Sequence, residues 1–241
     1  MDLREESSAM SFDDEISHWW FQTRFKYIDK AISFIDNGDL KIIEYGCGTA
    51  QNLFYLSQNK IKHKEIRSLV GIDPNIKDEY IPKWLETDGG IQKFNRGENT
   101  FNLLLAMDVL EHIEKPEEEL KNWIYHLDPG SIVLITLPAF MHLWSHHDNY
   151  LGHKKRYTIK SMNSLAEGVG LKKLYSNYFF SHIYIPALII RKIFRNEGKT
   201  SDLRKNNFII NAFLRKIGTA ECYFNLPKPF GTSVVGIFMK K

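Results

Sequence analysis

The sequence contains few cysteines and no apolar stretch long enough to cross a membrane. Its two cysteines, Cys47 and Cys222, lie far apart and form no CxxC pair, and no secretory signal pattern begins the sequence. This argues against a disulfide framework or a zinc ribbon and predicts a cytoplasmic protein. A long uncharged run, residues 174–190, contains His182 and Pro186 and is shorter than the roughly 20 apolar residues of a spanning helix.

The chain also lacks a strong net charge. The formal charge is +3 at pH 7, from 32 lysines and arginines against 29 acidic residues, so no nucleic-acid partner is expected. The charges are unevenly distributed, because residues 1–15 are acidic and residues 191–205 are basic. With 241 residues, of which 43% are hydrophobic and 25% charged, the chain has the composition of one large globular domain.

Short apolar runs alternate with helical patterns through the first 138 residues. Continuous apolar strands that lie between helices are typical of a parallel sheet covered on both faces. The pattern predicts an α/β fold, with a Rossmann-like, doubly wound and mostly parallel sheet. The expected strands are residues 40–45, 68–73, 101–107 and 131–137, and the expected helices are residues 51–59 and 116–127.

The remaining chain predicts a helix over residues 158–168 and two late strands, 171–180 and 232–239, which pair at a sheet edge with the last strand antiparallel. We expect a helical cap over residues 1–38 and a domain over residues 39–241, with a helical insert at about 181–228. Two interpretations of the insert stay open. Its apolar segment and the basic residues after it either lie on an anionic membrane surface or form a buried strand and a helix that covers the sheet edge.

A glycine turn follows the first expected strand and is the strongest local signal. The segment Glu44-Tyr45-Gly46-Cys47-Gly48 leads from a strand into a helix, and Asp73 ends the next strand. Glycines let the backbone approach a ligand, and the ends of neighbouring parallel strands lie side by side, where an acidic group can accept the hydroxyls of a ribose. The alternative is an ordinary tight turn with two solvated acids.

The electrostatics of this turn separate two kinds of cofactor. A dinucleotide-binding turn has a third glycine, where this sequence has Gln51, and Glu44 would repel a phosphate. S-adenosylmethionine carries a sulfonium and an ammonium group but no phosphate. Glu44 therefore favours S-adenosylmethionine over NAD or FAD.

Four segments in order resemble the motifs of the class I S-adenosylmethionine-dependent methyltransferases. They are Glu44–Ala50, Val70–Asp73, Ala106–Ile113 with its Asp-Val-Leu-Glu-His core, and Leu127–Pro138 with a Leu-x-Pro-Gly turn. The resemblance implies the fold of that class. The sequence departs from it at Ala50 and Ser131, where many members have glycine, and we expect alanine to be small enough for its position.

The flanking segments resemble a bacterial and archaeal subgroup of these enzymes. Its members begin with His-Trp-Trp-Phe-x-x-Arg, here residues 18–24, and carry Gly-His-x-Arg-Arg-Tyr-Thr, here residues 152–158 with Lys155 in place of the first arginine. Many end, as here, in Pro-x-Gly-Thr-Ser, residues 229–233. The acceptors of this subgroup are often unassigned, and some members are connected with cell-surface glycans or lipids.

The resemblance implies a role for each residue of the cofactor site. Glu44 would meet the amino end of the cofactor, Gly46 and Gly48 would line it, Asp73 would hold the ribose, and Asp108 would lie beside the sulfonium. Asp88 is the expected adenine contact, unless the residues after it form a strand. Trp20 and Arg24 would cover the cofactor, with Arg24 on its carboxylate; the alternative is a helix buried on the sheet.

The segment after the fifth expected strand is the predicted acceptor site. We expect it to be lined by His142, Asp148, His153, Arg156 and Tyr157, with His153 as the catalytic base and Asp148 or Tyr157 orienting its ring. The competing account is that residues 152–158 only lock the loop onto the next helix, with Thr158 as its N-cap. Glu111 and His112 either orient their own segment or touch substrate.

Four histidines fall within residues 142–153, and His142 and His146 have the spacing of one helix face. No second carboxylate or cysteine stands nearby, and we expect no metal.

The sequence therefore predicts an enzyme that moves a methyl group in line from S-adenosylmethionine to a small-molecule or a glycan- or lipid-linked acceptor, and releases S-adenosylhomocysteine. A non-catalytic scaffold of the same fold, at a membrane or on a partner protein, is the alternative. A dehydrogenase is disfavoured by the missing third glycine and the lack of a Tyr-x-x-x-Lys pair.

Overall fold

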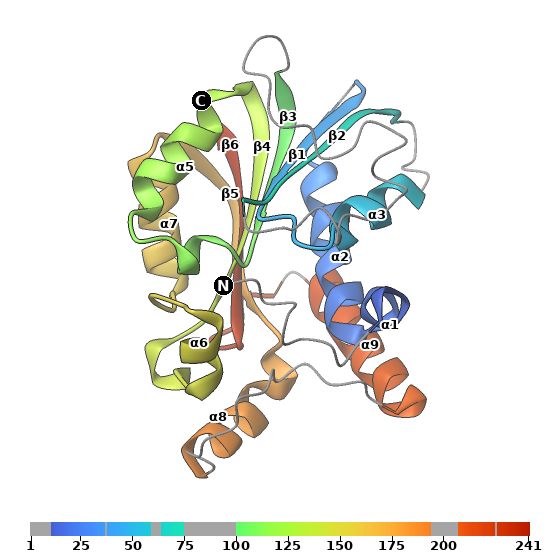
Figure 1. Cartoon of the computed structure of the whole chain (residues 1–241), viewed down its shortest axis with the longest axis vertical. Helices are drawn as coiled ribbons and strands as arrows, with labels where there is room; N and C mark the ends of the chain where they lie inside the picture. Colours follow the sequence, from blue (N-terminus) through green and yellow to red (C-terminus); the bar gives the residue numbers. More distant parts are fainter. Residues whose placement is uncertain (1–10, 37, 59–63, 75–99, 194–206, 225) are drawn as a thin grey trace.

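A computed structural model describes residues 11–36, 38–58, 64–74, 100–193, 207–224 and 226–241. Its centre is a six-stranded sheet in the order β2-β1-β3-β4-β6-β5 (Figure 1). The strands are β1 Leu40–Tyr45, β2 Ile66–Ile72, β3 Phe101–Met107, β4 Leu127–Pro138, β5 Leu171–Phe179 and β6 Ser233–Lys240.

The direction of the strands confirms the predicted sheet. Strands β2, β1, β3 and β4 are parallel, and β6 is antiparallel to both of its neighbours, β4 and β5. The antiparallel last strand therefore lies inside the sheet, with β5 outside it. The fold is that of the class I methyltransferases.

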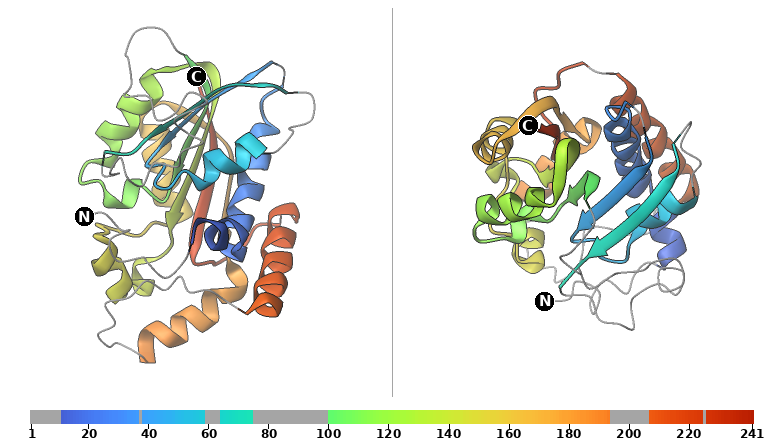
Figure 2. Two further views of the ribbon diagram at one scale, coloured as in Figure 1. Left: turned by 45° about the vertical axis from the view of Figure 1, so that its right-hand side comes forward. Right: turned by 90° about the horizontal axis from the view of Figure 1, so that it is seen from above.

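Helices cover both faces of the sheet (Figures 1 and 2). The helices α5 and α7 lie on one face, and α2 and α3 lie on the other. The bounds are α1 Phe12–Ser17, α2 Trp19–Ile32, α3 Gln51–Gln58, α5 Pro116–Tyr125, α6 His146–Leu151, α7 Ile159–Gly168, α8 Tyr184–Ile193 and α9 Phe208–Tyr223, with short 3-10 turns η2 Leu110–His112, η3 Met141–Leu143 and η4 Ser181–Ile183.

The central strands are apolar at almost every position because both of their faces are covered. In β3, Leu104 and Ala106 belong to the core beneath α5 and α7, whereas Leu103 and Leu105 belong to the core beneath α2. All four side chains are completely buried. This explains why the sequence shows a continuous apolar run here and not an alternating one.

The start of β4 differs from its predicted position. Strand β4 begins at Leu127, although the sequence predicted a helix to residue 127 and a strand from Ser131. Pairing with β3 jumps from Phe101–Leu127 to Leu103–Ile132, and Gly130 has φ +84° within the jump. The Leu-x-Pro-Gly segment is thus an irregular first part of the strand, which glycine accommodates because it tolerates positive φ.

The N-terminal helices and the insert contribute differently to the core. In α2, Phe25, Tyr27 and Ile28 are completely buried against the sheet. Helix α9 packs on α2 so closely that a Cβ at Gly218 would lie 2.2 Å from Thr23 Oγ1. Helix α2, which lies within the cap predicted over residues 1–38, thus shares its buried side chains with the core of the sheet.

The apolar segment before the basic stretch is divided between two elements. Strand β5 ends at Phe179, and α8 follows; none of the side chains described in it, residues 184–192, is buried. Helix α8 projects from the end of the sheet and does not cover its edge (Figure 1). Among the described residues, no helix is long and apolar enough to span a bilayer.

Candidate active site

The carboxyl ends of the strands carry unusual backbone conformations. Four described residues other than glycine have positive φ: Ala50 at +62°, Asp108 at +58°, Phe140 at +56° and Phe180 at +58°. Each follows the end of a strand, namely β1, β3, β4 and β5. A left-handed conformation costs a residue with a side chain roughly 1–2 kcal/mol, and such strain gathers at functional sites. At Ala50 the expectation of a harmless alanine was incomplete, because its methyl group fits only with this strain.

The glycine turn after β1 is fastened to the end of β2. The amide of Gly46 donates to the Ile72 carbonyl at 2.7 Å, and the amide of Gly48 donates to Asp73 Oδ2 at 2.9 Å. Gly46 has φ +69°, and a Cβ there would lie 2.3 Å from Val109 Cγ2, so only glycine fits. The turn therefore brings together the ends of β1, β2 and β3, as the sequence predicted.

Glu44 is buried at the end of β1 with half of its carboxyl group unsatisfied. Asn52 Nδ2 on α3 donates to Oε1 at 2.5 Å, but Oε2 has no hydrogen-bond partner. Burial raises the pKa of Glu44 to about 8, although Asn52 and Arg24 act in the opposite direction. The carboxyl group is therefore mostly protonated at pH 7, and a cation beside it would ionise it.

Arg24 connects α2 with the end of β3. Its guanidinium contacts Asp108 at 3.2 Å, donates to the Met107 carbonyl at 3.0 Å and lies 4.2 Å from the centre of the Trp20 ring. Its Nε atom is buried without a hydrogen-bond partner. Of the aromatic residues beside Trp20, Trp19 and Phe21 are buried in the core. Helix α2 is thus buried on the sheet, with Arg24 and Trp20 beside Asp108.

Asp148 organises the predicted acceptor side. It is fully buried, its Oδ2 accepts the Ser145 amide at 2.8 Å, and its Oδ1 accepts Arg156 Nε at 2.7 Å and lies 2.8 Å from His153 Nδ1. Burial alone would raise the pKa of Asp148, but the contacts with His153 and Arg156 hold it well below its usual range. The ionised carboxylate therefore holds the His153 ring through Nδ1 and leaves Nε2 on the side away from Asp148.

Arg156 and Tyr157 are turned into the protein. Arg156 Nη1 donates to the Ala139 carbonyl at 3.0 Å, so two of its nitrogens already have partners. Tyr157 is 1% exposed, and its hydroxyl donates to the Leu110 carbonyl at 3.4 Å. Thr158 is the N-cap of α7, as the competing account requires. These contacts give both residues a positioning function in the loop.

His142 lies apart from this group. It is exposed, its Nε2 contacts the Tyr184 hydroxyl at 2.8 Å, and its ring stacks on Phe140. His142 belongs to η3 and His146 begins α6, so they do not share a helix face. The predicted adenine contact, Asp88, is outside the described residues.

The structure also brings His153 next to Glu111 and His112, which the sequence analysis treated apart from it. The ligand-type atoms of Glu111, His112 and His153 all lie within 4.8 Å of one another. The rings of His112 and His153 are 4.7 Å apart, and the Lys154 amide donates to the Glu111 carbonyl at 2.6 Å. Burial, and then His153, lower the pKa of His112 to about 4. The only signal in the sequence was that each histidine follows the end of a parallel strand.

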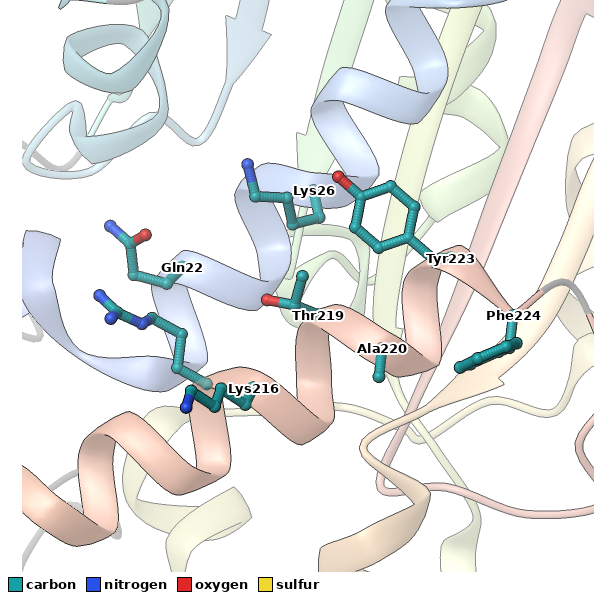
Figure 3. A pocket seen from close by; sticks show the side chains of 8 residues that line it. Gln22, Lys26, Lys216, Thr219, Ala220, Tyr223 and Phe224 are labelled. Atoms are coloured by element: carbon teal, nitrogen blue, oxygen red, sulfur yellow. The ribbon is translucent and has the colours of Figure 1, made fainter.

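A separate groove of 510 Å³ lies between α2 and α9 (Figure 3). It contains none of the predicted site residues. Its lining is basic and aromatic, with Lys26, Arg215, Lys216, Tyr223 and Phe224 among the side chains.

Solved structures of the same fold cover nearly the whole chain. A putative methyltransferase in complex with the Haloferax volcanii activator Trm112 has a TM-score of 0.56 and 15% identity, over 98% of this chain and 96% of the other. The [4+2]-cyclase SpnF has a TM-score of 0.54 and 13% identity, over 90% and 81%. An S-adenosylmethionine-dependent methyltransferase from Mesorhizobium loti has a TM-score of 0.53 and 12% identity, over 88% and 96%. At these identities the likeness establishes the fold only.

No curated protein matches the chain. The family model described as "Methyltransferase domain" matches residues 20–176, which is more than half of the sequence. This confirms the predicted enzyme class, whereas the subgroup defined by the two flanking motifs stays a prediction. The chain belongs to the methyltransferase-domain family and is an S-adenosylmethionine-dependent methyltransferase of class I fold.

Proposed function

We propose that the chain transfers a methyl group from S-adenosylmethionine to a small acceptor that is free or attached to a glycan or lipid. The observation that carries the proposal is the buried carboxyl group of Glu44, whose Oε2 has no partner, beside the glycine turn. The ammonium group of the cofactor would supply a cationic partner for this carboxyl group. The cofactor has no phosphate, which suits the acidic surroundings. When bound, the cofactor supplies a methyl group already activated by a sulfonium.

The roles that we propose for the other residues follow from placing the cofactor beside Glu44. Asp73 would accept the ribose hydroxyls, Gly46 and Gly48 would line the cofactor with backbone, and Arg24 would offer its Nε to the cofactor carboxylate. Asp108, held by Arg24, would face the sulfonium. In-line transfer needs mainly alignment, and these groups are held by the ends of β1, β2 and β3.

The first test is cofactor binding. Replacing Asp73 by alanine should weaken S-adenosylhomocysteine binding about 30- to 150-fold, because charged hydrogen bonds of roughly 2–3 kcal/mol are lost. Titration calorimetry measures the effect, and Asp128→Ala, at an exposed position of β4, is the matched control. An unchanged affinity in folded Asp73→Ala would remove Asp73 from the site.

The acceptor side is proposed at the ends of β3 and β4. His153 Nε2 would accept a proton there, with Asp148 orienting the ring, as in other acid–base sites that use histidine. Arg156 and Tyr157 would hold the loop, and His142 would contribute from η3. A non-catalytic scaffold is less favoured, because a scaffold does not require a buried carboxyl with an unsatisfied oxygen.

The exposed faces of α8 and α9 favour an acceptor at a membrane surface. Large apolar side chains are at least 49% exposed on both helices, and basic residues accompany them, Arg191 and Lys192 on α8 and Arg215 and Lys216 on α9. Helix α8 projects at the end of the sheet toward which β4 runs, which is the proposed acceptor side (Figure 1). The exposed apolar residues are Ile185, Ile189 and Ile190 on α8 and Phe208, Ile209, Ile210, Phe213 and Tyr223 on α9.

We therefore expect the protein to associate with anionic vesicles, as a cytoplasmic enzyme at the inner membrane face would. In flotation with phosphatidylglycerol vesicles, the protein should rise with the lipid layer at low salt and stay behind at high salt. Neutral vesicles should bind less, because each basic residue contributes about 1 kcal/mol near an anionic surface.

The double variant Ile189→Glu/Ile190→Glu should abolish flotation, whereas Lys172→Glu, at an exposed position of β5, should not. Equal recovery of all variants, or no flotation of the wild type, would contradict a membrane surface.

A further inference from the structure

We propose that Glu111, His112 and His153 bind one divalent transition-metal ion at the end of β3. Two imidazole nitrogens and one carboxylate oxygen are the ligands of open, catalytic zinc-type sites, in which further positions remain for water or substrate. Imidazole nitrogens favour zinc, copper, iron or nickel over magnesium, which prefers oxygen. The three ligand atoms come from η2 and from the loop after α6.

The geometry needs little adjustment to close around a metal. All three ligand atoms lie within 4.8 Å of one another, and Glu111 Oε1 and His153 Nε2 are 3.9 Å apart. Metal bonds of about 2.0–2.1 Å place ligand atoms roughly 3.3 Å from each other, so rotations of the side chains are sufficient. The backbone hydrogen bond between Lys154 and Glu111 already holds the two segments together.

Glu111 supplies an independent indication of a ligand. Its side chain is 1% exposed, and Oε2 is buried without any hydrogen-bond partner. Its Oε1 is too far from His153 for a hydrogen bond. A buried carboxyl oxygen in this condition lacks a partner, and a bound cation would supply one.

Both histidines are fixed through hydrogen bonds, as metal-binding histidines usually are. His153 uses Nδ1 to contact Asp148, which leaves Nε2 toward Glu111. His112 makes a hydrogen bond with the backbone of Leu151. Carboxylate and carbonyl partners of this kind set the tautomer and orient the free nitrogen toward the metal.

The role of the metal rests on the proposed methyl transfer and replaces the role of base proposed above for His153, because an Nε2 atom bound to a metal no longer accepts a proton. An acceptor hydroxyl in the open position would lose its proton to water more easily, since a Lewis acid lowers its pKa. Its oxygen would then bond to the methyl carbon as the carbon–sulfur bond breaks and its electron pair remains on sulfur. The inferred acceptor is therefore an alcohol or phenol.

The test titrates the full chain, stripped with a chelator, with Co²⁺ and follows its visible absorption. We expect saturation at one Co²⁺ per chain and displacement by Zn²⁺. His112→Ala and His153→Ala should weaken binding at least about 100-fold, and Asp148→Asn about 10- to 100-fold. Glu111→Gln keeps the shape of the side chain and should also weaken binding, whereas His146→Ala, at an exposed histidine, should not.

Absence of a Co²⁺ spectrum in the wild type, or equal affinity in folded Glu111→Gln, His112→Ala and wild type, would overturn the metal site. Calorimetry with S-adenosylhomocysteine in the presence of the chelator separates the two proposals. If the chain binds the cofactor but no metal, only the metal site is refuted. If it binds metal but not the cofactor, only the proposed function is refuted.

Discussion

Replacing Arg24 by leucine should lower the free energy of unfolding by about 3 kcal/mol. Arg24 is 5% exposed and is the ion-pair partner of Asp108, whose side chain is 22% exposed. Removing one member of a buried pair leaves an uncompensated charge, which typically costs 3–5 kcal/mol, and the partial exposure of Asp108 places this case at the lower end. Burial raises the pKa of Glu44 and of Glu111, and Arg24 acts against this rise, so both acids would lose that support.

Urea unfolding at pH 7 measures the effect, provided that the dependence on urea concentration is unchanged. The matched control is Arg67→Leu. Arg67 pairs with Asp39 and Glu65 at the surface, and its side chain is 57% exposed, so the loss should be much smaller than for Arg24. Similar losses in the two variants would show that the Arg24 pair is no stronger than a surface pair.

Replacing His153 by alanine should lower methyl transfer about 10²- to 10⁴-fold and leave S-adenosylhomocysteine binding intact. His153 is nearly buried, and Asp148 holds its ring through Nδ1, which leaves Nε2 on the other side of the ring. The rate is measured as S-adenosylhomocysteine formed with an acceptor found by screening sugar-nucleotide and polyprenyl-linked compounds. A variant that keeps wild-type turnover would leave residues 152–158 with a locking function only.

The loss of turnover does not by itself distinguish a base from a metal ligand. Chelation does, because a base at Nε2 works in the absence of metal. If the ion is required, wild-type turnover should fall on chelation and return with Zn²⁺ or Co²⁺, while His146→Ala behaves as wild type.

The sheet could be predicted from the sequence because each strand and turn is indicated by residues that are close together in the chain. The apolar runs of β1, β3 and β4 and the turn around Gly46 each lie within a few residues of one another, and their order determines the topology. The same holds for Asp73, which is one residue past β2 and reaches Gly48 through its side chain.

The acceptor side was less accessible to sequence reasoning because its contacts join distant segments. The meeting of His112 with His153 depends on the backbone hydrogen bond from Lys154 to Glu111, which no periodicity encodes. Arg156 was expected to line the acceptor site, yet its guanidinium contacts Asp148 and the Ala139 carbonyl. Burial decided these pairings, and a single sequence gives no direct measure of burial for polar residues.

The place of β6 inside the sheet makes the sheet depend on its last strand. Strand β5 pairs only with β6, and β6 pairs with β4, so β6 links β5 to the four parallel strands. Without β6 the edge of β4 would be open to other strands, the condition under which chains associate wrongly. Removal of Ser233–Lys240 would therefore detach β5 from the sheet as well and expose the edge of β4.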